Sequence, residues 1–175
     1  MIDLIKPSSK YAKDIFLYKK EMIEHGNPLN GFRSIENFDN YRDWETYLHE
    51  SENLTQVDEL SQRAPTSQYF LLRRKDNKIV ASVEIRHILS DFLLACGGNI
   101  GYSVRPGERG KGYAKLALKL ALNLCRCLGL KKVLVTTDFD NYGSIRTILA
   151  NGGIFENEVY CEKYKIAIRR YWISL

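Results

Sequence analysis

The sequence Val104-Arg105-Pro106-Gly107-Glu108-Arg109-Gly110-Lys111-Gly112-Tyr113-Ala114 follows a strand-like run, residues 99–104, and leads into an amphipathic pattern that ends near Leu128. A strand, a basic turn and a helix start form an anion site, because the N–H groups of the first helical turn are free and the helix dipole adds positive potential. Gly110 and Gly112 let the backbone approach a ligand closely, while Arg109 and Lys111 add charge. The stretch therefore predicts a phosphate-binding turn, not a surface turn with two solvated cations.

Two familiar phosphate loops do not fit this turn. A P-loop requires Ser or Thr after Gly-Lys to hold magnesium, and Gly112 stands at that position. A dinucleotide fingerprint requires a third glycine three residues after Gly112, and Lys115 stands there instead. The pattern Arg/Gln-x-x-Gly-x-Gly/Ala does fit, and Arg109, Gly112 and Ala114 satisfy it.

With a strand before it and a helix after it, this pattern resembles the acetyl-coenzyme A pyrophosphate loop of the GCN5-related N-acetyltransferase (GNAT) superfamily. The resemblance implies that acetyl-coenzyme A is the cosubstrate. It also implies that backbone N–H groups of residues 109–114 bind the pyrophosphate and that the preceding strand supplies an N–H group to the developing oxyanion. The cofactor contacts expected from these two segments are Tyr102, Ser103, Val104, Arg109, Gly110, Lys111, Gly112, Tyr113 and Ala114.

The resemblance continues downstream of the turn. Residues 131–137 read as a buried strand rich in β-branched side chains. The next helix opens with Asn141 and Ser144, which resemble the Asn-x-x-Ser/Ala start that contacts the pantetheine arm in GNAT enzymes. Residues 153–155, Gly-Ile-Phe, resemble the Gly-Phe that follows it, with an isoleucine interposed. Helix capping is a second role for Asn141 and Ser144, and the two roles are compatible.

Hydrophobic periodicity predicts the order strand, two helices, three strands, helix, strand, helix, two strands. This order indicates a mixed α/β chain in which residues 1–175 form a single domain. The resemblance implies the GNAT fold, in which helices flank one mostly antiparallel central sheet. The second helix is expected over residues 38–49 and residues 51–67 as a loop. In the first helix, the apolar side is expected to hold Tyr11, Ile15, Phe16, Met22 and Ile23.

Composition agrees with an ordinary globular domain. The chain has 175 residues, 45% of them hydrophobic, with no apolar run of membrane-spanning length. Residues 1–6 show no basic region followed by an apolar core, so we expect a cytoplasmic protein. No Cys-x-x-Cys pair exists, which predicts free buried thiols and no metal site for Cys96, Cys125, Cys127 and Cys161.

The net charge of +5 conceals an asymmetry. Residues 105–119 carry a local charge of +4, and residues 36–59 carry −7. The basic block suits a phosphate-rich cofactor, whereas the acidic block suits a small cationic amine as acceptor or is simply a solvated helix face. The acidic block comprises Glu36, Asp39, Asp43, Glu45, Glu50, Glu52, Asp58 and Glu59.

Acetyl transfer to an amine requires a route for the proton of the amine. Glu84 and Arg86 lie on one face of a predicted strand, with Ile85 and His87 on the other. Glu84 is the first candidate for the catalytic base, although an ion pair with Arg86 is an equally good role. His87 is the second candidate, because its intrinsic pKa lies near working pH.

The general acid is where this chain departs from the family. Many GNAT enzymes carry a tyrosine seven residues after the asparagine that opens the last helix, and here that position is Ile148. Either Tyr142, Tyr160 or Tyr164 protonates the leaving thiolate, with Tyr164 preferred, or solvent does so. Direct attack on the thioester requires no nucleophilic cysteine.

Two other classes of function stay open. One is a non-catalytic acyl-coenzyme A-binding module on the same fold, which the missing tyrosine favours. The other is a nucleic-acid-binding protein, suggested by the pI near 9.0 but not accompanied by a basic stripe interleaved with aromatic residues. We expect a small-molecule amine as substrate, no nucleic acid or membrane partner, and leave room for a homodimer.

Overall fold

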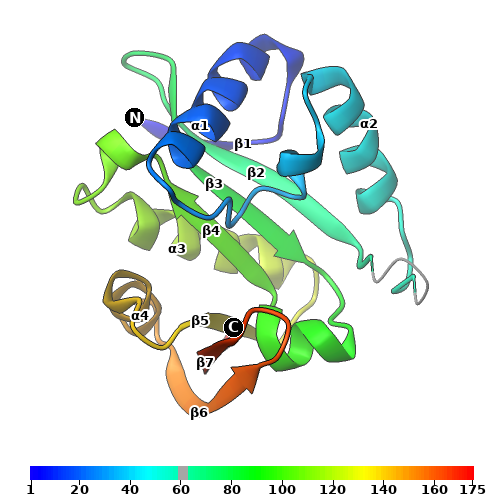
Figure 1. The fold of residues 1–175 in the computed structure, drawn as a ribbon, viewed down its shortest axis with the longest axis vertical. Helices are drawn as coiled ribbons and strands as arrows, with labels where there is room; N and C mark the ends of the chain where they lie inside the picture. The colour runs from blue at the N-terminus through cyan, green and yellow to red at the C-terminus, as the bar shows by residue number, and fades with distance from the viewer. Residues whose placement is uncertain (59–62) are drawn as a thin grey trace.

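The computed structural model describes residues 1–58 and 63–175 (Figure 1). The predicted order of elements is confirmed, with short 3₁₀ turns and one π-helical turn, Leu93–Gly97, between them. The elements are β1 (Ile2–Ile5), α1 (Ala12–Glu24), α2 (Tyr41–Glu52), β2 (Thr66–Arg73), β3 (Lys78–Arg86), β4 (Ile100–Val104), α3 (Tyr113–Cys127), β5 (Lys132–Asp138), α4 (Tyr142–Leu149), β6 (Ile154–Cys161) and β7 (Ile166–Ser174).

The strands form two sheets rather than one. The first has the order β1-β2-β3-β4 and the second the order β5-β7-β6, and neighbouring strands within each are antiparallel. The mixed α/β class with antiparallel sheets and flanking helices is thus confirmed. The single central sheet is corrected to two sheets that separate between β4 and β5.

Asn99 joins the two sheets at the start of β4. Its backbone N–H donates to the Leu134 carbonyl at 2.7 Å, and its side-chain Oδ1 accepts from the Leu134 N–H at 2.8 Å. On the other side it accepts from the Arg86 N–H at 2.8 Å and donates through Nδ2 to the Arg86 carbonyl at 3.1 Å. Among the described residues no further hydrogen bond joins β4 to β5, so the strands part beyond this point.

Two hydrophobic cores cover opposite faces of the first sheet, because alternate residues of a strand point to opposite sides. Leu71 of β2 packs with α3 and β5, whereas its neighbours Phe70 and Leu72 pack with α1 and α2. Figure 1 shows α1 and α2 together over one side of the sheet. The first sheet therefore separates the core beneath α1 and α2 from the core beneath α3.

Several expectations about individual residues were wrong. Helix α2 begins at Tyr41 and not at Phe38, because the Asn40 side chain accepts from the Asp43 N–H at 3.0 Å and caps it there. Ile23 is exposed, since α1 buries Ile15, Tyr18 and Met22 at spacings of three and four. The thiol of Cys127 is exposed as well, while the other three cysteines are buried.

No helix in the described ranges combines the length and apolar character needed to cross a membrane.

Candidate functional site

A cavity of about 1050 Å³ lies where β4 and β5 part. Its wall includes residues 100–104 of β4, residues 136–138 of β5, the start of α3, one side of α4 and the segment after α1 around Gly31. This volume stands at the upper end of the range for small-molecule sites, so an elongated ligand fits.

The turn before α3 presents consecutive free amides to this cavity. None of the backbone N–H groups of residues 110–115 donates to another group of the described chain. Gly110 and Gly112 have φ of 76° and 80°, the left-handed region that favours glycine, and no atom lies within 4 Å of a Cβ built on either. The N–H of Arg109 donates to the Pro106 carbonyl instead, so the free set runs over 110–115 and not over the expected 109–114.

Of the cationic side chains around the turn, two line the cavity and one is held by an ion pair outside its wall. Arg109 lines the cavity and donates to the Val104 carbonyl at 3.2 Å, and Lys115 lines it too. Lys111 does not line it: its ammonium donates to Glu108 at 2.8 Å. Glu108 is buried and also binds Arg73 through two oxygens at 2.6 and 3.0 Å. The hydrogen bonds of Arg73, outweighing burial, hold the pKa of Glu108 far below its ordinary value.

The alternation of β4 decides which of its amides face the cavity. Arg105 donates its N–H to the Val80 carbonyl, and Arg86 donates to Asn99, so the odd-numbered residues of β4 bond to β3. The N–H groups of Tyr102 and Val104 consequently point to the gap between the sheets. Ser103 points its N–H to β3, and its hydroxyl lies 3.1 Å from that of Tyr18.

Asn141 and Ser144 lie at the start of α4 and both line the cavity. The Asn141 side chain accepts from the Ser144 N–H at 3.1 Å, which is the expected cap. The Ser144 hydroxyl lies 2.8 Å from the Tyr102 hydroxyl, across the gap. Burial raises the pKa of Tyr102 to about 12. The Tyr113 hydroxyl turns away from this group and accepts from Arg73 at 3.2 Å.

Glu84 takes the ion-pair role that its position on the strand left open. It is 4% exposed and is not part of the cavity wall. One carboxylate oxygen accepts from Arg86 at 3.0 Å, and the other lies 3.5 Å from Nη1 of Arg33. Arg86 itself lines the cavity and donates to the Gly97 and Gly98 carbonyls, at 3.0 Å each.

His87 lies away from the cavity. Its Nε2 is 2.9 Å from the Ser67 hydroxyl, which donates to Glu52 at 2.8 Å. Because that hydroxyl hydrogen is committed to the carboxylate, His87 must donate at Nε2. Burial lowers the pKa of His87. Neither of the two candidate bases, Glu84 and His87, therefore lines the cavity.

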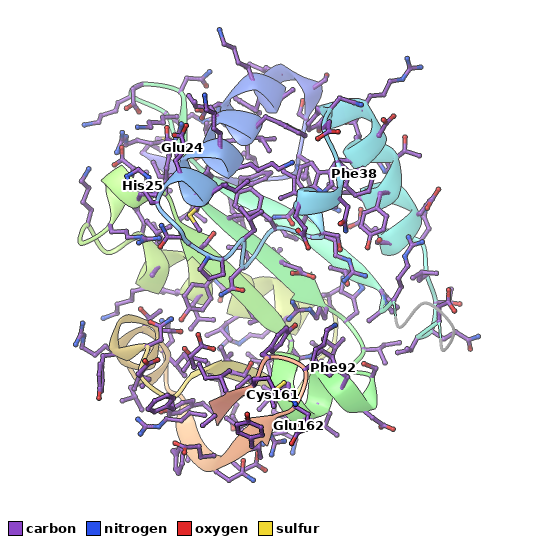
Figure 2. All side chains as sticks on the ribbon, in the orientation of Figure 1. Glu24, His25, Phe38, Phe92, Cys161 and Glu162 are labelled. Atoms are coloured by element: carbon purple, nitrogen blue, oxygen red, sulfur yellow. The ribbon has the colours of Figure 1, made fainter. Side chains whose placement is uncertain are left out.

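Tyr164 is the one of the three candidate tyrosines that lines the cavity. All three tyrosines are exposed, but Tyr142 and Tyr160 belong to no part of the wall, and Ile148 is fully buried in the core. Tyr164 packs edge-on against Phe92, with ring centroids 5.9 Å apart. Figure 2 shows Phe92 close to Cys161, with which it shares a small hydrophobic cluster. Burial raises the pKa of Tyr164.

The acidic block does not border the cavity. None of its described members lines the wall, and Glu59 lies outside the described residues. Glu52 pairs with Lys6, Glu50 with Arg63, and Glu45 accepts from the Tyr41 hydroxyl. The solvated-face interpretation of this block thus fits the structure.

Sequence reasoning missed cavity residues whose placement depends on tertiary contacts. Asp138 is the clearest case: it ends β5, lines the cavity and carries no side-chain hydrogen bond or ion pair among the described residues. Its position three residues before Asn141 was the available signal. The other missed charged residues in the wall are Arg86, Glu108, Lys115 and Arg146.

Comparison with known proteins gives the family of this chain. The model of the acetyltransferase (GNAT) family matches residues 29–152. No curated protein sequence matches the chain.

Solved structures share the fold. The ribosomal-protein-S5-alanine acetyltransferase of Vibrio fischeri is 20% identical with a TM-score of 0.72, and the match covers 99% of this chain and 91% of that one. A point mutant of the spermidine N-acetyltransferase SpeG of Vibrio cholerae is 13% identical with a TM-score of 0.63, covering 98% and 94%. YncA of Salmonella typhimurium, solved with its cofactor acetyl-coenzyme A, is 13% identical with a TM-score of 0.65, covering 99% and 94%.

At these identities the solved structures establish the fold, while the family model spans well over half of the chain. The sequence pattern at residues 109–114, the parted strands and the family match agree. The chain therefore belongs to the GNAT acetyltransferase family, enzymes that use acetyl-coenzyme A as cosubstrate.

Proposed function

We propose that the chain transfers the acetyl group of acetyl-coenzyme A to a primary amine by direct attack of the amine on the thioester. The observation that carries this proposal is the row of free amides at residues 110–115, which opens into the cavity between β4 and β5. Amides at a helix start favour a phosphate, and parted strands leave room for an extended arm beside them.

The residues present fit this cosubstrate. Gly110 and Gly112 leave space for pyrophosphate oxygens against the backbone, and Arg109 and Lys115 add positive charge from the same wall. Asn141 and Ser144 border the gap from α4, where they would contact the pantetheine arm. Lys111 would act indirectly in this proposal, because its ammonium is bound to Glu108.

The chain supplies groups for both charges that develop in the reaction. The N–H groups of Tyr102 and Val104 point to the gap, where one of them would stabilise the oxyanion. We assign protonation of the leaving thiolate to Tyr164, since it lines the cavity where Ile148 cannot. A Tyr164→Phe variant should then lower kcat and leave coenzyme A affinity unchanged.

The acceptor is proposed to be a small cationic amine. This part of the proposal now depends on Asp138, an unpaired carboxylate in the wall, because the acidic block lies elsewhere. Among the similar structures, one is named for spermidine and another for the alanine of a ribosomal protein. Both a polyamine and a peptide amino terminus therefore belong in the test.

The test is release of free coenzyme A from acetyl-coenzyme A with spermidine, aminoglycosides, amino acids and a peptide with amino-terminal alanine. Amine-dependent release supports the proposed function, and a spermidine rate that falls steeply with salt supports a cationic acceptor. Preference for a neutral or anionic amine would remove the cationic assignment alone.

A second candidate function is a non-catalytic acyl-coenzyme A-binding module. Many relatives have the tyrosine that acts as general acid at the position of Ile148, and the burial of this isoleucine favours the non-catalytic alternative. Tight binding of acetyl-coenzyme A without release of coenzyme A for any amine would establish this alternative.

A further inference from the structure

We propose that Asp138 is the general base that removes the proton from the attacking amine. The inference rests on the proposed function and assigns a residue to a step that Glu84 and His87 do not fill in this geometry. Three independent observations support it: the position of Asp138 in the cavity, its lack of a partner and the face of β5 on which it lies.

Only two carboxylates of the described chain line the cavity, Asp138 and Glu108. Glu108 binds Arg73, Lys78 and Lys111, so its oxygens are occupied and its charge is neutralised. Asp138 has no side-chain hydrogen bond and no ion pair among the described residues. A base must offer a free lone pair to the proton that it removes, and Asp138 alone of the two does so.

The alternation of β5 gives the face on which Asp138 lies. Val133 and Val135 pack into the core beneath α3. Thr136, two residues before Asp138, points the other way and donates through Oγ1 to the Cys96 carbonyl at 2.9 Å. Cys96 and Tyr164 line the same cavity. Asp138 therefore lies on the same face of β5 as Thr136. It lines the same cavity as Tyr164, the residue assigned to protonate the thiolate.

The surroundings of Asp138 also suit a base. Burial, together with the charge of Asp140, raises the pKa of Asp138 above its ordinary value. A raised pKa makes a carboxylate a stronger base toward the proton of the amine. The other titratable or charged side chains of the cavity wall are Arg86, Cys96, Tyr102, Glu108, Arg109, Tyr113, Lys115, Arg146 and Tyr164.

The nitrogen of the amine forms a bond to the thioester carbonyl carbon, and one of its protons passes to a carboxylate oxygen of Asp138, directly or through one water. The carbon–sulfur bond then breaks, and the thiolate takes a proton from Tyr164. Solvent restores both side chains to their starting protonation states, and the products are the N-acetyl amine and free coenzyme A.

The test compares Asp138→Asn, Asp138→Glu and Asp140→Asn with the wild type, using the amine that gives the highest rate. Asp138→Asn should lower kcat at saturating amine and neutral pH by about 10²-fold, as expected for loss of a general base. Its affinity for coenzyme A should stay within about twofold, because a neutral amide of the same size replaces a group with no partner. Asp138→Glu should recover part of the rate.

Asp140→Asn is the matched control, since it removes the same charge from an exposed neighbour outside the cavity wall. It should keep the wild-type rate at neutral pH. Removal of a like charge lowers the pKa of Asp138, so the acidic limb of the pH–rate profile should move to lower pH. The Asp138→Asn variant should lack that limb.

The outcomes separate this inference from the proposed function. Near wild-type activity of Asp138→Asn at every pH, or a loss of coenzyme A binding equal to its loss of rate, would overturn the assignment of the base alone. Absence of amine-dependent coenzyme A release by the wild-type protein would overturn the proposed function, and the base with it.

Discussion

The backbone of Asn99 and that of Leu134 lie against each other at the point where the two sheets part. Asn99 donates its N–H to the Leu134 carbonyl at 2.7 Å, and its side chain accepts the Leu134 N–H at 2.8 Å. A Cβ at the preceding residue, Gly98, would lie 2.6 Å from the same carbonyl, and its φ is 67°. This contact therefore combines a buried asparagine with a glycine that cannot be replaced without strain.

Replacing Asn99 with alanine should lower the free energy of unfolding by about 3 kcal/mol, because the buried Leu134 N–H and the partly buried Arg86 carbonyl each lose their partner. Urea unfolding monitored by circular dichroism measures the change. Wild-type stability of Asn99→Ala would contradict the junction role.

Replacing Gly112 with glutamate should abolish coenzyme A binding. The change adds a side chain at φ of 80°, where L residues are strained, and a negative charge beside the expected pyrophosphate. Gly107→Ala is the matched control in the same turn, since a Cβ there meets no atom within 4 Å and φ is not in the left-handed region. Isothermal titration with coenzyme A gives the result, and normal binding by Gly112→Glu would remove the loop from the cofactor site.

Replacing Glu108 with glutamine should change how stability depends on pH. Its pKa is lowered in the folded chain from the ordinary 4.5, so its stabilisation is present above about pH 4.5 and is lost as pH falls toward the folded value. Below pH 4.5 the wild type should therefore lose stability more steeply than Glu108→Gln. At pH 7 the variant should be about 2 kcal/mol less stable, since Arg73 loses a buried ionic partner. Parallel curves for the two proteins would argue against the charge cluster.

Replacing Glu84 with glutamine distinguishes its two roles. In the ion-pair role the variant loses stability, by about 2 kcal/mol, because Arg33 and Arg86 keep their charges with no compensating carboxylate. Turnover at a temperature where the variant is folded should then stay near that of the wild type. A loss of about 10²-fold in turnover with unchanged stability would instead restore Glu84 as the base.

The turn before α3 and the start of α4 were predictable because the information for them is local. Gly110 and Gly112 adopt φ values that few other residues tolerate, and the helix start follows directly in sequence. Asn141 likewise caps its own helix. Each of these features depends on neighbours a few residues away, and a periodic or capping pattern captures such neighbours well.

The surroundings of Glu84 and the junction of the two sheets were less predictable because distant partners position these residues. Nothing near Glu84 in sequence reveals Arg33, which reaches it from the segment between α1 and α2. The division into two sheets depends on Asn99, whose side chain replaces its own backbone N–H in bonding to Arg86. The prediction that Ile23 is on the apolar side of α1 was wrong for a simpler reason. The buried stripe of α1 is narrow, and Ile23 lies about 100° around the helix axis from Met22.

The gap between β4 and β5 also links the stability of this protein to its cosubstrate. A ligand that contacts both walls binds the folded chain and not the unfolded one, and at about 100 times its Kd such a ligand adds about 2.7 kcal/mol to the free energy of unfolding. We expect amides of β5 and β7 to exchange more slowly with deuterium when coenzyme A is present, since within the described ranges only Asn99 and Leu134 otherwise tie β5 to β4 through hydrogen bonds. The concentration of acetyl-coenzyme A would then set the resistance of the chain to unfolding and proteolysis, in addition to the rate of the reaction.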